Sequence, residues 1–259
     1  MLYNRKFDIT ATAADGGTID PEGVTKVPYS KSITYTITPH AGYTIKSVLV
    51  DGKDIGAVNT YTFKSVTKKH TIHAIFEAVN PYTDIKANDW FYDDVLFVTV
   101  EGLMNGTGNG KFSPATTSDR AMLLTVLWRL EGSPVVNGSA AFTDVADGQW
   151  YSDAIAWASA NGIVNGYGNG KFGPNDPLTR EQIMAILNRY AAYKNWTDGI
   201  ALPMLPQYTC SDWAESNVIW AEISGLLTNL GVNISDMTAE ASRAELAAYL
   251  HRFMINIVP

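Results

Sequence analysis

The chain has 259 residues, of which 46% are hydrophobic and 17% are charged, a composition that suits folded structure and argues against disorder. Its formal charge of −7 divides into +2 for residues 1–80 (nine basic, seven acidic) and −9 for residues 81–259 (ten basic, nineteen acidic), so neither part has the basic stripe that a nucleic-acid partner requires. A single cysteine, Cys210, excludes an internal disulfide, and no apolar run approaches the roughly 20 residues of a membrane-inserted helix.

Residues 1–79 are predicted to form a small antiparallel β domain. Ile33, Tyr35 and Ile37 alternate with threonines, and residues 72–76 repeat this period of two, which is typical of half-buried strands. Asp51-Gly52 supplies a hairpin turn directly after an apolar segment. We therefore expect four to six strands connected by turns.

This β region resembles the divergent internalin-B-type repeat modules of bacterial surface proteins. The likeness rests on the pattern of residues 42–43, 48–52 and 71–76 and not on a chemical motif. The resemblance implies a spacer or stalk unit.

From residue 80 onward the sequence is an internal repeat. The segment NGTGNGKF at residues 105–112 returns as NGYGNGKF at residues 165–172, sixty positions later. A weaker third copy follows at an offset of sixty-three. Asn80-Pro81 ends the β region, which predicts domains at 1–79 and 80–259, with repeats at about 81–132, 140–192 and 206–255.

Two helices are expected in each repeat. Apolar residues recur at the helical period, and the second helix opens after a capping residue, Asp119, Thr179 or Ser242. Two helices and a glycine loop cannot bury their apolar faces alone, so three units should pack together. The expected fold class is α+β by separate domains: the β domain, then an all-α three-motif bundle with a pseudo-threefold arrangement.

An arginine stands at the first position of each second helix: Arg120, Arg180 and Arg243. A cation at this end of the helix dipole is misplaced by about 0.3–1 kcal/mol, so each arginine should meet an anion. Two readings stay open here. The anion is an internal acid such as Asp84 or Asp144, or it is the carboxylate of a ligand.

Residues 142–145, 150–151, 162–166, 172–174 and 178–181 together resemble a surface-layer homology (SLH) motif, and three tandem motifs would cover residues 81–259. The resemblance implies a non-catalytic module that anchors bacterial surface proteins to secondary cell-wall polysaccharide, through a pyruvylated amino sugar held between motifs. It also implies an extracellular location at the cell wall. Residues 1–7 lack the apolar core of a signal peptide, so we expect a fragment of a surface protein.

Transferred position by position, the resemblance implies one set of ligand-binding residues: Asp84, Trp90, Gly106, Arg120, Asp144, Trp150, Gly166, Arg180, Glu181, Trp213 and Arg243. The tryptophans also suit a core position, and the glycines a turn. The third motif departs from the pattern, with Cys210 in place of aspartate and Asn229 in place of a loop glycine. The sequence therefore ranks Arg120 and Arg180 above Arg243 for binding.

Other chemistries find little support. The glycine loop lacks the spacing of a phosphate-binding loop, no calcium loop or metalloprotease motif occurs, and the four histidines are scattered. We expect no catalytic residue, metal or cofactor, and the sequence leaves self-association open. The alternatives are an oligomerisation unit with protein-binding grooves and the accessory tail of a polysaccharide-degrading enzyme.

Overall fold

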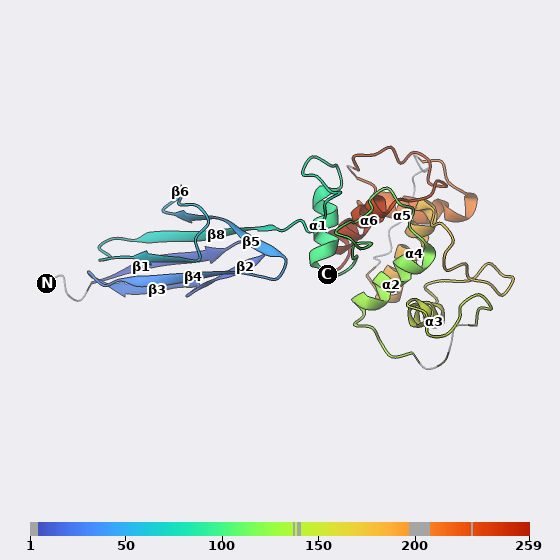
Figure 1. The fold of residues 1–259 in the computed structure, drawn as a ribbon, viewed down its shortest axis with the longest axis horizontal. Coiled ribbons are helices and arrows are strands. Elements are labelled where there is room, and N and C mark those ends of the chain that lie inside the picture. Colours follow the sequence, from blue (N-terminus) through green and yellow to red (C-terminus); the bar gives the residue numbers. More distant parts are fainter. Residues whose placement is uncertain (1–4, 137, 139–140, 197–207, 229) are drawn as a thin grey trace. The chain divides into compact units, whose positions relative to one another are not determined.

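The alternating segments of the first 80 residues form strands in the computed structural model, which describes residues 5–136, 138, 141–196, 208–228 and 230–259 (Figure 1). The chain divides into two compact units, Met1–Asn80 and Pro81–Pro259. The strands of the first unit are β1 (Lys6–Ala13), β2 (Gly17–Asp20), β3 (Gly23–Pro28), β4 (Ile33–Pro39), β5 (Tyr43–Val50), β6 (Lys53–Asp54), β7 (Thr60–Phe63) and β8 (His70–Ala78).

These strands make two sheets, with the orders β3-β1-β8-β5-β6 and β2-β4-β7. The expected number of four to six strands is wrong, because eight strands are described. The strand pairs are antiparallel, as expected, except that β1 pairs with β8 in parallel. Alternation in the sequence identifies a strand but not its neighbour. Here the two ends of the unit, far apart in the chain, meet in the middle of one sheet.

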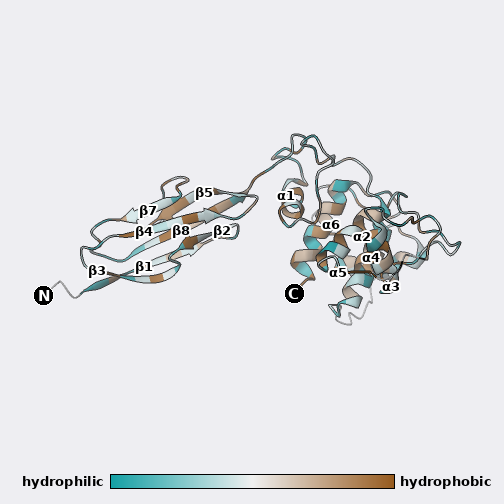
Figure 2. Cartoon of the chain, turned by 60° about the horizontal axis from the view of Figure 1, so that its bottom comes forward, coloured by the Kyte–Doolittle hydropathy of each residue, from teal (hydrophilic) through white to brown (hydrophobic). Residues whose placement is uncertain are grey.

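The inward-facing residues of both sheets form the core of this unit. Ile9, Tyr35 and Ile72 are at most 1% exposed, and each lies on a different strand. In Figure 2 brown, hydrophobic residues interrupt the paler ones along the strands, which is the alternation that the sequence predicts. Burial of this face, and not a disulfide, holds the sheets together.

The second unit contains the helices α1 (Tyr92–Val100), α2 (Arg120–Leu130), α3 (Ser152–Ala160), α4 (Arg180–Tyr193), α5 (Glu215–Ile223) and α6 (Arg243–Asn256), with a short 3₁₀ helix at Asp212–Ala214. Each repeat thus supplies two helices, as predicted. The expected second and third repeats begin at residues 140 and 206, which lie outside the described residues.

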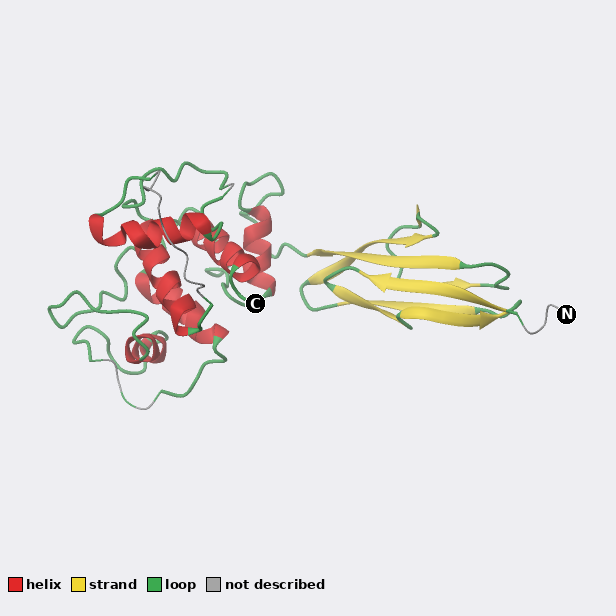
Figure 3. Cartoon of the chain, turned by 180° about the vertical axis from the view of Figure 1, so that it is seen from behind, coloured by secondary structure: helices red, strands yellow, loops and turns green. Residues whose placement is uncertain are grey.

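The expectation of an all-α three-motif bundle with a pseudo-threefold arrangement is wrong. Long loops separate the helices (Figure 3), and extended segments before the second helices pair with one another by isolated β-bridges. These bridges join Thr117 to Ser242, Asp119 to Pro177 and Thr179 to Glu240. Helical periodicity could not reveal them, because their backbone groups find partners in other repeats and not in their own.

The helix ends follow the sequence signals closely. The side chains of Asp119, Thr179 and Ser242 each accept the backbone N–H three residues later, and the last two complete capping boxes. The first helices of the repeats end before Gly102, Gly162 and Gly225, which adopt φ of 68°, 69° and 76°. Local chemistry therefore sets where the helices begin and end.

Packing between repeats builds the core of this unit. Helix α2 packs on α3, α4 packs on α5, and α6 packs on α1, so each second helix contacts a first helix of a different repeat. Leu123, Leu187 and Leu250, one from each second helix, are all completely buried. Among the described helices, none combines the length and apolarity needed to cross a membrane.

Candidate functional site

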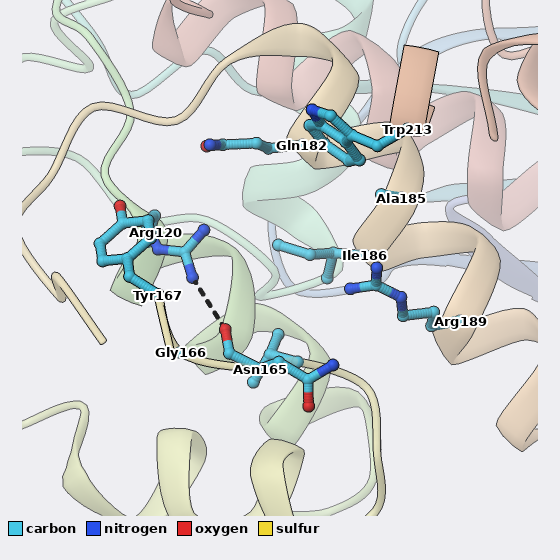
Figure 4. Close-up of a pocket in the computed structure, with 10 residues that line it drawn as sticks. Arg120, Asn165, Gly166, Tyr167, Gln182, Ala185, Ile186, Arg189 and Trp213 are labelled. Carbon is cyan, nitrogen blue, oxygen red and sulfur yellow. Dashed lines mark hydrogen bonds between the residues drawn. The ribbon is translucent and has the colours of Figure 1, made fainter. Parts of the chain in front are cut away.

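Two cavities of about 210 Å³ each open where the repeats of the second unit meet. We call one the Trp213 groove, whose polar and aromatic lining comprises Arg120, Asn165, Tyr167, Gln182, Arg189 and Trp213 (Figure 4). We call the other the Trp150 groove, lined by Met104, Asn105, Met122, Arg129, Trp150 and Arg243 among others. The two occupy equivalent places in the repeats.

Each groove is composed from all three repeats. In the Trp213 groove, the second repeat supplies the loop at Asn165 and one face of α4, the third supplies Trp213, and the first supplies Arg120. In the Trp150 groove, the first repeat supplies the loop and α2, while Trp150 and Arg243 come from the second and third. An arginine therefore serves the groove of the repeat that follows it, and not its own.

Arg120 is held in the Trp213 groove by main-chain carbonyls. It is 6% exposed, and it donates from Nε to the carbonyl of Phe172 at 3.1 Å and from Nη2 to that of Asn165 at 3.4 Å. Its guanidinium stacks on the rings of Phe172 and Tyr167, at 4.5 and 4.9 Å from their centroids. Burial lowers the pKa of Arg120, an effect that the nearby Tyr167 and Asp176 partly offset and that the charge of Arg189 reinforces.

Arg243 repeats this arrangement in the Trp150 groove. It is 5% exposed, donates from Nε to the carbonyl of Phe112 at 2.9 Å and from Nη2 to that of Asn105 at 2.7 Å, and stacks on Phe112 at 4.6 Å. Burial lowers its pKa also, although a guanidinium stays charged. Within the described part of the chain, neither Arg243 nor Arg120 forms a salt bridge, although the carboxylates of Asp84 and Asp119 act on Arg243 from a greater distance, and those of Asp144 and Asp176 on Arg120.

At the place in the third repeat that corresponds to these grooves, the chain's own residues pair with the arginine and cover the tryptophan. Arg180 lies 2.7 Å from Glu245 Oε1 and donates from Nη1 to the carbonyl of Asp236. Gly231 approaches Trp90 so closely that a β-carbon on this glycine would lie 2.5 Å from that of the tryptophan. The cation is neutralised here, and the aromatic ring is covered by the loop.

The two aspartates of the sequence-derived set do not face a groove ligand. Asp84 accepts the N–H groups of Phe112 and Ser113 at 2.9 and 2.8 Å, and Asp144 accepts those of Phe172 and Gly173 at 2.8 Å. Burial raises the pKa of Asp84 and Asp144, but these hydrogen bonds more than offset it, so both pKa values lie below their ordinary value. Each aspartate ties the glycine loop to the start of its repeat.

Glu181 and the glycines also have internal roles. Glu181 is 5% exposed and accepts hydrogen bonds from the N–H and Oγ of Ser211 at 2.8 and 2.9 Å. Gly106 and Gly166 need no unusual φ, but a β-carbon at either position would collide with a lysine carbonyl and an aromatic ring. Asn229, expected at a ligand-facing loop position, lies outside the described residues.

The structure adds groove residues that the sequence reading did not select. Arg129 and Arg189 are exposed, and each lines a groove together with a buried arginine. In Figure 4 Arg189 and Arg120 lie on opposite sides of the cavity. The signal was present, because the sixty-residue offset pairs Arg129 with Arg189. At the next offset Arg252 is engaged by Asp94, at 3.2 Å.

The three tryptophans divide between surface and interior. Trp150 and Trp213 are 55% and 53% exposed and line their grooves, whereas Trp90 is half-buried against the third-repeat loop. A large ring left half in water beside unpaired arginines can stack on a ligand. No group of three or more His, Cys, Asp or Glu residues suited to a metal occurs in the described ranges.

Comparison with known proteins identifies the family of part of the second unit. The model of the S-layer homology domain matches residues 81–121 and 141–184. Relatives include an amylopullulanase of Thermoanaerobacterium thermosulfurigenes, 31% identical over 78% of this chain and 11% of that protein. The exoglucanase XynX of Acetivibrio thermocellus is 29% identical over 66% of this chain and 16% of that protein. The S-layer protein Sap of Bacillus anthracis is 23% identical over 63% of this chain and 19% of that protein.

The matched region is thus a small part of each relative, since the chain spans 11% to 19% of these proteins. The resemblance to the SLH motif is confirmed for the first two repeats, and the third repeat and the internalin-type module stay predictions. A cell-surface location follows from the S-layer homology match and the S-layer relatives. Residues 81–121 and 141–184 are S-layer homology motifs, and the chain is similar to bacterial proteins that include S-layer proteins and an amylopullulanase.

Proposed function

We propose that this chain anchors a protein to the bacterial cell wall by holding acidic sugar residues of a wall polysaccharide in the Trp150 and Trp213 grooves. The S-layer homology motifs support anchoring at the cell surface, and the grooves supply the chemistry of recognition. Binding without catalysis is proposed for residues 80–259.

The observation that carries the proposal is the pair of buried, unpaired cations. An ion that loses its water without gaining a partner is costly, so proteins pair such groups. Among the described residues, the partners of Arg120 and Arg243 are carbonyls, aromatic rings and, for Arg243, the thioether of Met122, and none is a carboxylate in a salt bridge. A ligand carboxylate that enters the groove supplies the missing charge, through charge-assisted hydrogen bonds to the remaining N–H groups.

The remaining lining suits a sugar. Trp213 and Trp150 offer half-exposed rings for stacking on the apolar face of a pyranose. Arg189 and Arg129 add a second cation at the edge of each cavity, which favours an acidic sugar over a neutral one. A cavity of about 210 Å³ is smaller than a typical drug-sized pocket, so each groove accommodates about one sugar residue.

The family resemblance suggests which acid this is. Motifs of this kind are associated with a pyruvylated amino sugar, whose ketal carries a carboxylate. We propose that group as the ligand acid in at least one groove. Two arginines in each groove make an acidic ligand a better match than a purely apolar protein segment. The experiment below distinguishes this proposal from the alternative that the grooves bind protein.

The β unit has a simpler proposed role. Residues 1–79 carry a small net charge of +2 and resemble spacer modules. We propose that they form a separate domain that holds the anchoring part away from its cargo and contributes nothing to wall binding.

The relatives favour a second, compatible role for the parent protein. Two of the relatives described above are named as an amylopullulanase and an exoglucanase, and a third relative as an endoglucanase. We propose, as a second role, that the chain is the anchoring tail of a polysaccharide-degrading enzyme. The reading frame that surrounds this segment in its gene tests that role directly.

Sedimentation with purified cell walls tests the proposed function. The whole chain and residues 80–259 should bind equally, and removal of acidic substituents from the wall polysaccharide should abolish binding of both. Binding that survives this removal, or that requires wall protein, would contradict the proposal. Loss of binding on deletion of residues 1–79 would contradict the spacer role alone.

A further inference from the structure

The two grooves share a framework but differ where a ligand would touch them. Met122 in the Trp150 groove corresponds to Gln182 in the Trp213 groove. Each lies three residues after the capping residue of its helix. Tyr167 lines the Trp213 groove, whereas its counterpart Thr107 is not among the residues that line the Trp150 groove. These exchanges change the chemistry beside each buried arginine.

In the Trp150 groove the arginine faces a thioether. Nη1 of Arg243 lies 3.6 Å from Sδ of Met122. Met104 lines the same cavity, and the Thr125 hydroxyl is already bonded to the carbonyl of Ala121 at 2.8 Å. A carboxylate on Arg243 would therefore carry its neighbouring substituent onto an apolar, polarisable surface that favours a methyl group.

In the Trp213 groove the same position is polar. Gln182 uses Oε1 to accept the N–H of Thr179 at 3.3 Å, which leaves its amide N–H groups as donors. Tyr167 covers one face of Arg120 at 4.9 Å and keeps its own hydroxyl on Asp176 at 3.0 Å. Figure 4 shows Tyr167 against Arg120 and Gln182 next to Trp213, all around the same cavity. A substituent here meets donors and a ring edge, which favours a hydroxyl over a methyl.

We propose that the two grooves recognise different acidic sugar residues, with Met122 and Gln182 as the residues that set the difference. The Trp150 groove takes an acid whose carboxylate-bearing carbon also carries a methyl group, as in a lactyl ether or a ketal. The Trp213 groove takes a methyl-free acid of the uronic type. This inference rests on the proposed function, because it assumes that both grooves bind acidic sugars.

The test isolates each groove in the whole chain. Trp213→Ala leaves the Trp150 groove, and Trp150→Ala leaves the Trp213 groove; both rings are half-exposed, so thermal unfolding should show an intact fold. Calorimetric titration then compares N-acetylmuramic acid, whose lactyl group bears a methyl beside the carboxylate, with glucuronic acid, which lacks one. We expect the Trp150 groove to prefer the methyl-bearing acid by about fourfold, the effect of one buried methyl group, and the Trp213 groove to prefer glucuronic acid.

Substitutions at the two specificity positions complete the test. Met122→Gln, in the chain with only the Trp150 groove, should lose the preference for the methyl-bearing acid, whereas Met122→Leu should keep it. Gln182→Met, in the chain with only the Trp213 groove, should gain that preference. Equal preferences in both single-groove chains would overturn this inference and leave the proposed function standing. Failure of the unaltered chain to bind either acid or the wall polysaccharide would overturn both.

Discussion

Arg180 forms an ion pair with the buried Glu245, with Nη2 2.7 Å from Oε1, whereas Arg243, at the same position in its repeat, has carbonyls and rings as its partners. The same arginine therefore has a carboxylate partner in one repeat and only uncharged partners in another. Glu245 stands where the other repeats have Met122 and Gln182, so a single residue type decides whether the arginine is neutralised from within.

Arg120 and Arg243 should therefore act in ligand binding, and Arg180 in stability. We expect Arg243→Gln and Arg120→Gln each to weaken wall-polysaccharide binding ten- to a hundredfold at its groove, the effect of a lost charge-assisted hydrogen bond of about 1.5–3 kcal/mol. Calorimetric titration measures this. The sequence alone ranks Arg180 above Arg243, but the structure favours the opposite order, because Arg180 already has its anion.

Arg180→Ala is the matched control. It should leave the binding affinity within about twofold and lower the free energy of unfolding by about 3–5 kcal/mol, since Glu245 would be a buried, unpaired charge. A double variant, Arg180→Ala with Glu245→Gln, should recover part of that loss in chemical denaturation. Loss of binding in a folded Arg180→Ala chain would show that the third place also holds ligand.

The tryptophans should divide in the same manner. Trp150→Ala and Trp213→Ala remove rings that are more than half exposed, so we expect binding at the altered groove to be lost and the melting temperature to stay unchanged. Trp90→Ala should lower the melting temperature and leave binding unchanged, because Gly231 packs directly on this side chain. Thermal unfolding and titration of the three variants distinguish the roles; a Trp90→Ala chain that melts normally and binds poorly would contradict them.

Asp84 and Asp144 should make the second unit sensitive to acid. Their pKa values are depressed in the folded state, so their contribution to stability is fully present above the unfolded pKa of about 3.9 and is lost as the pH falls through the folded value. We expect the melting temperature to fall steeply below about pH 4. Asp144→Asn should flatten this decline and lower stability at pH 7, while Asp147→Asn, at an exposed position, should leave the profile unchanged.

The second unit should not survive the loss of its third repeat. Truncation after Ala192 removes α6, which packs on α1 and places Leu246, Leu250 and Phe253 in the core at 0% exposure. It also removes Arg243, which bonds to the carbonyls of the first repeat. Residues 80–192 should therefore show no cooperative thermal transition; a melting curve close to that of the intact chain would disprove the shared core.

Much of the local structure could be read from the sequence. The capping residues Asp119, Thr179 and Ser242 fixed the starts of α2, α4 and α6, because their side chains satisfy the first free N–H groups of a helix whatever surrounds it. Period-two alternation located strands for the same local reason. The internal repeat identified equivalent positions, among them the three arginines and three tryptophans.

Only the tertiary structure decided which of those equivalent residues meet. The parallel pairing of β1 with β8, the β-bridges before the second helices, and the assembly of each groove from three repeats all depend on contacts between segments far apart in the chain. Electrostatics followed from those contacts, because a charge is satisfied by whatever lies within a few ångströms of it and not by its place in a motif. Arg120, Arg180 and Arg243 are the same residue at the same helical position, but among the described residues Arg180 alone of the three forms a salt bridge, with Glu245, because the other two have carbonyls and rings as neighbours.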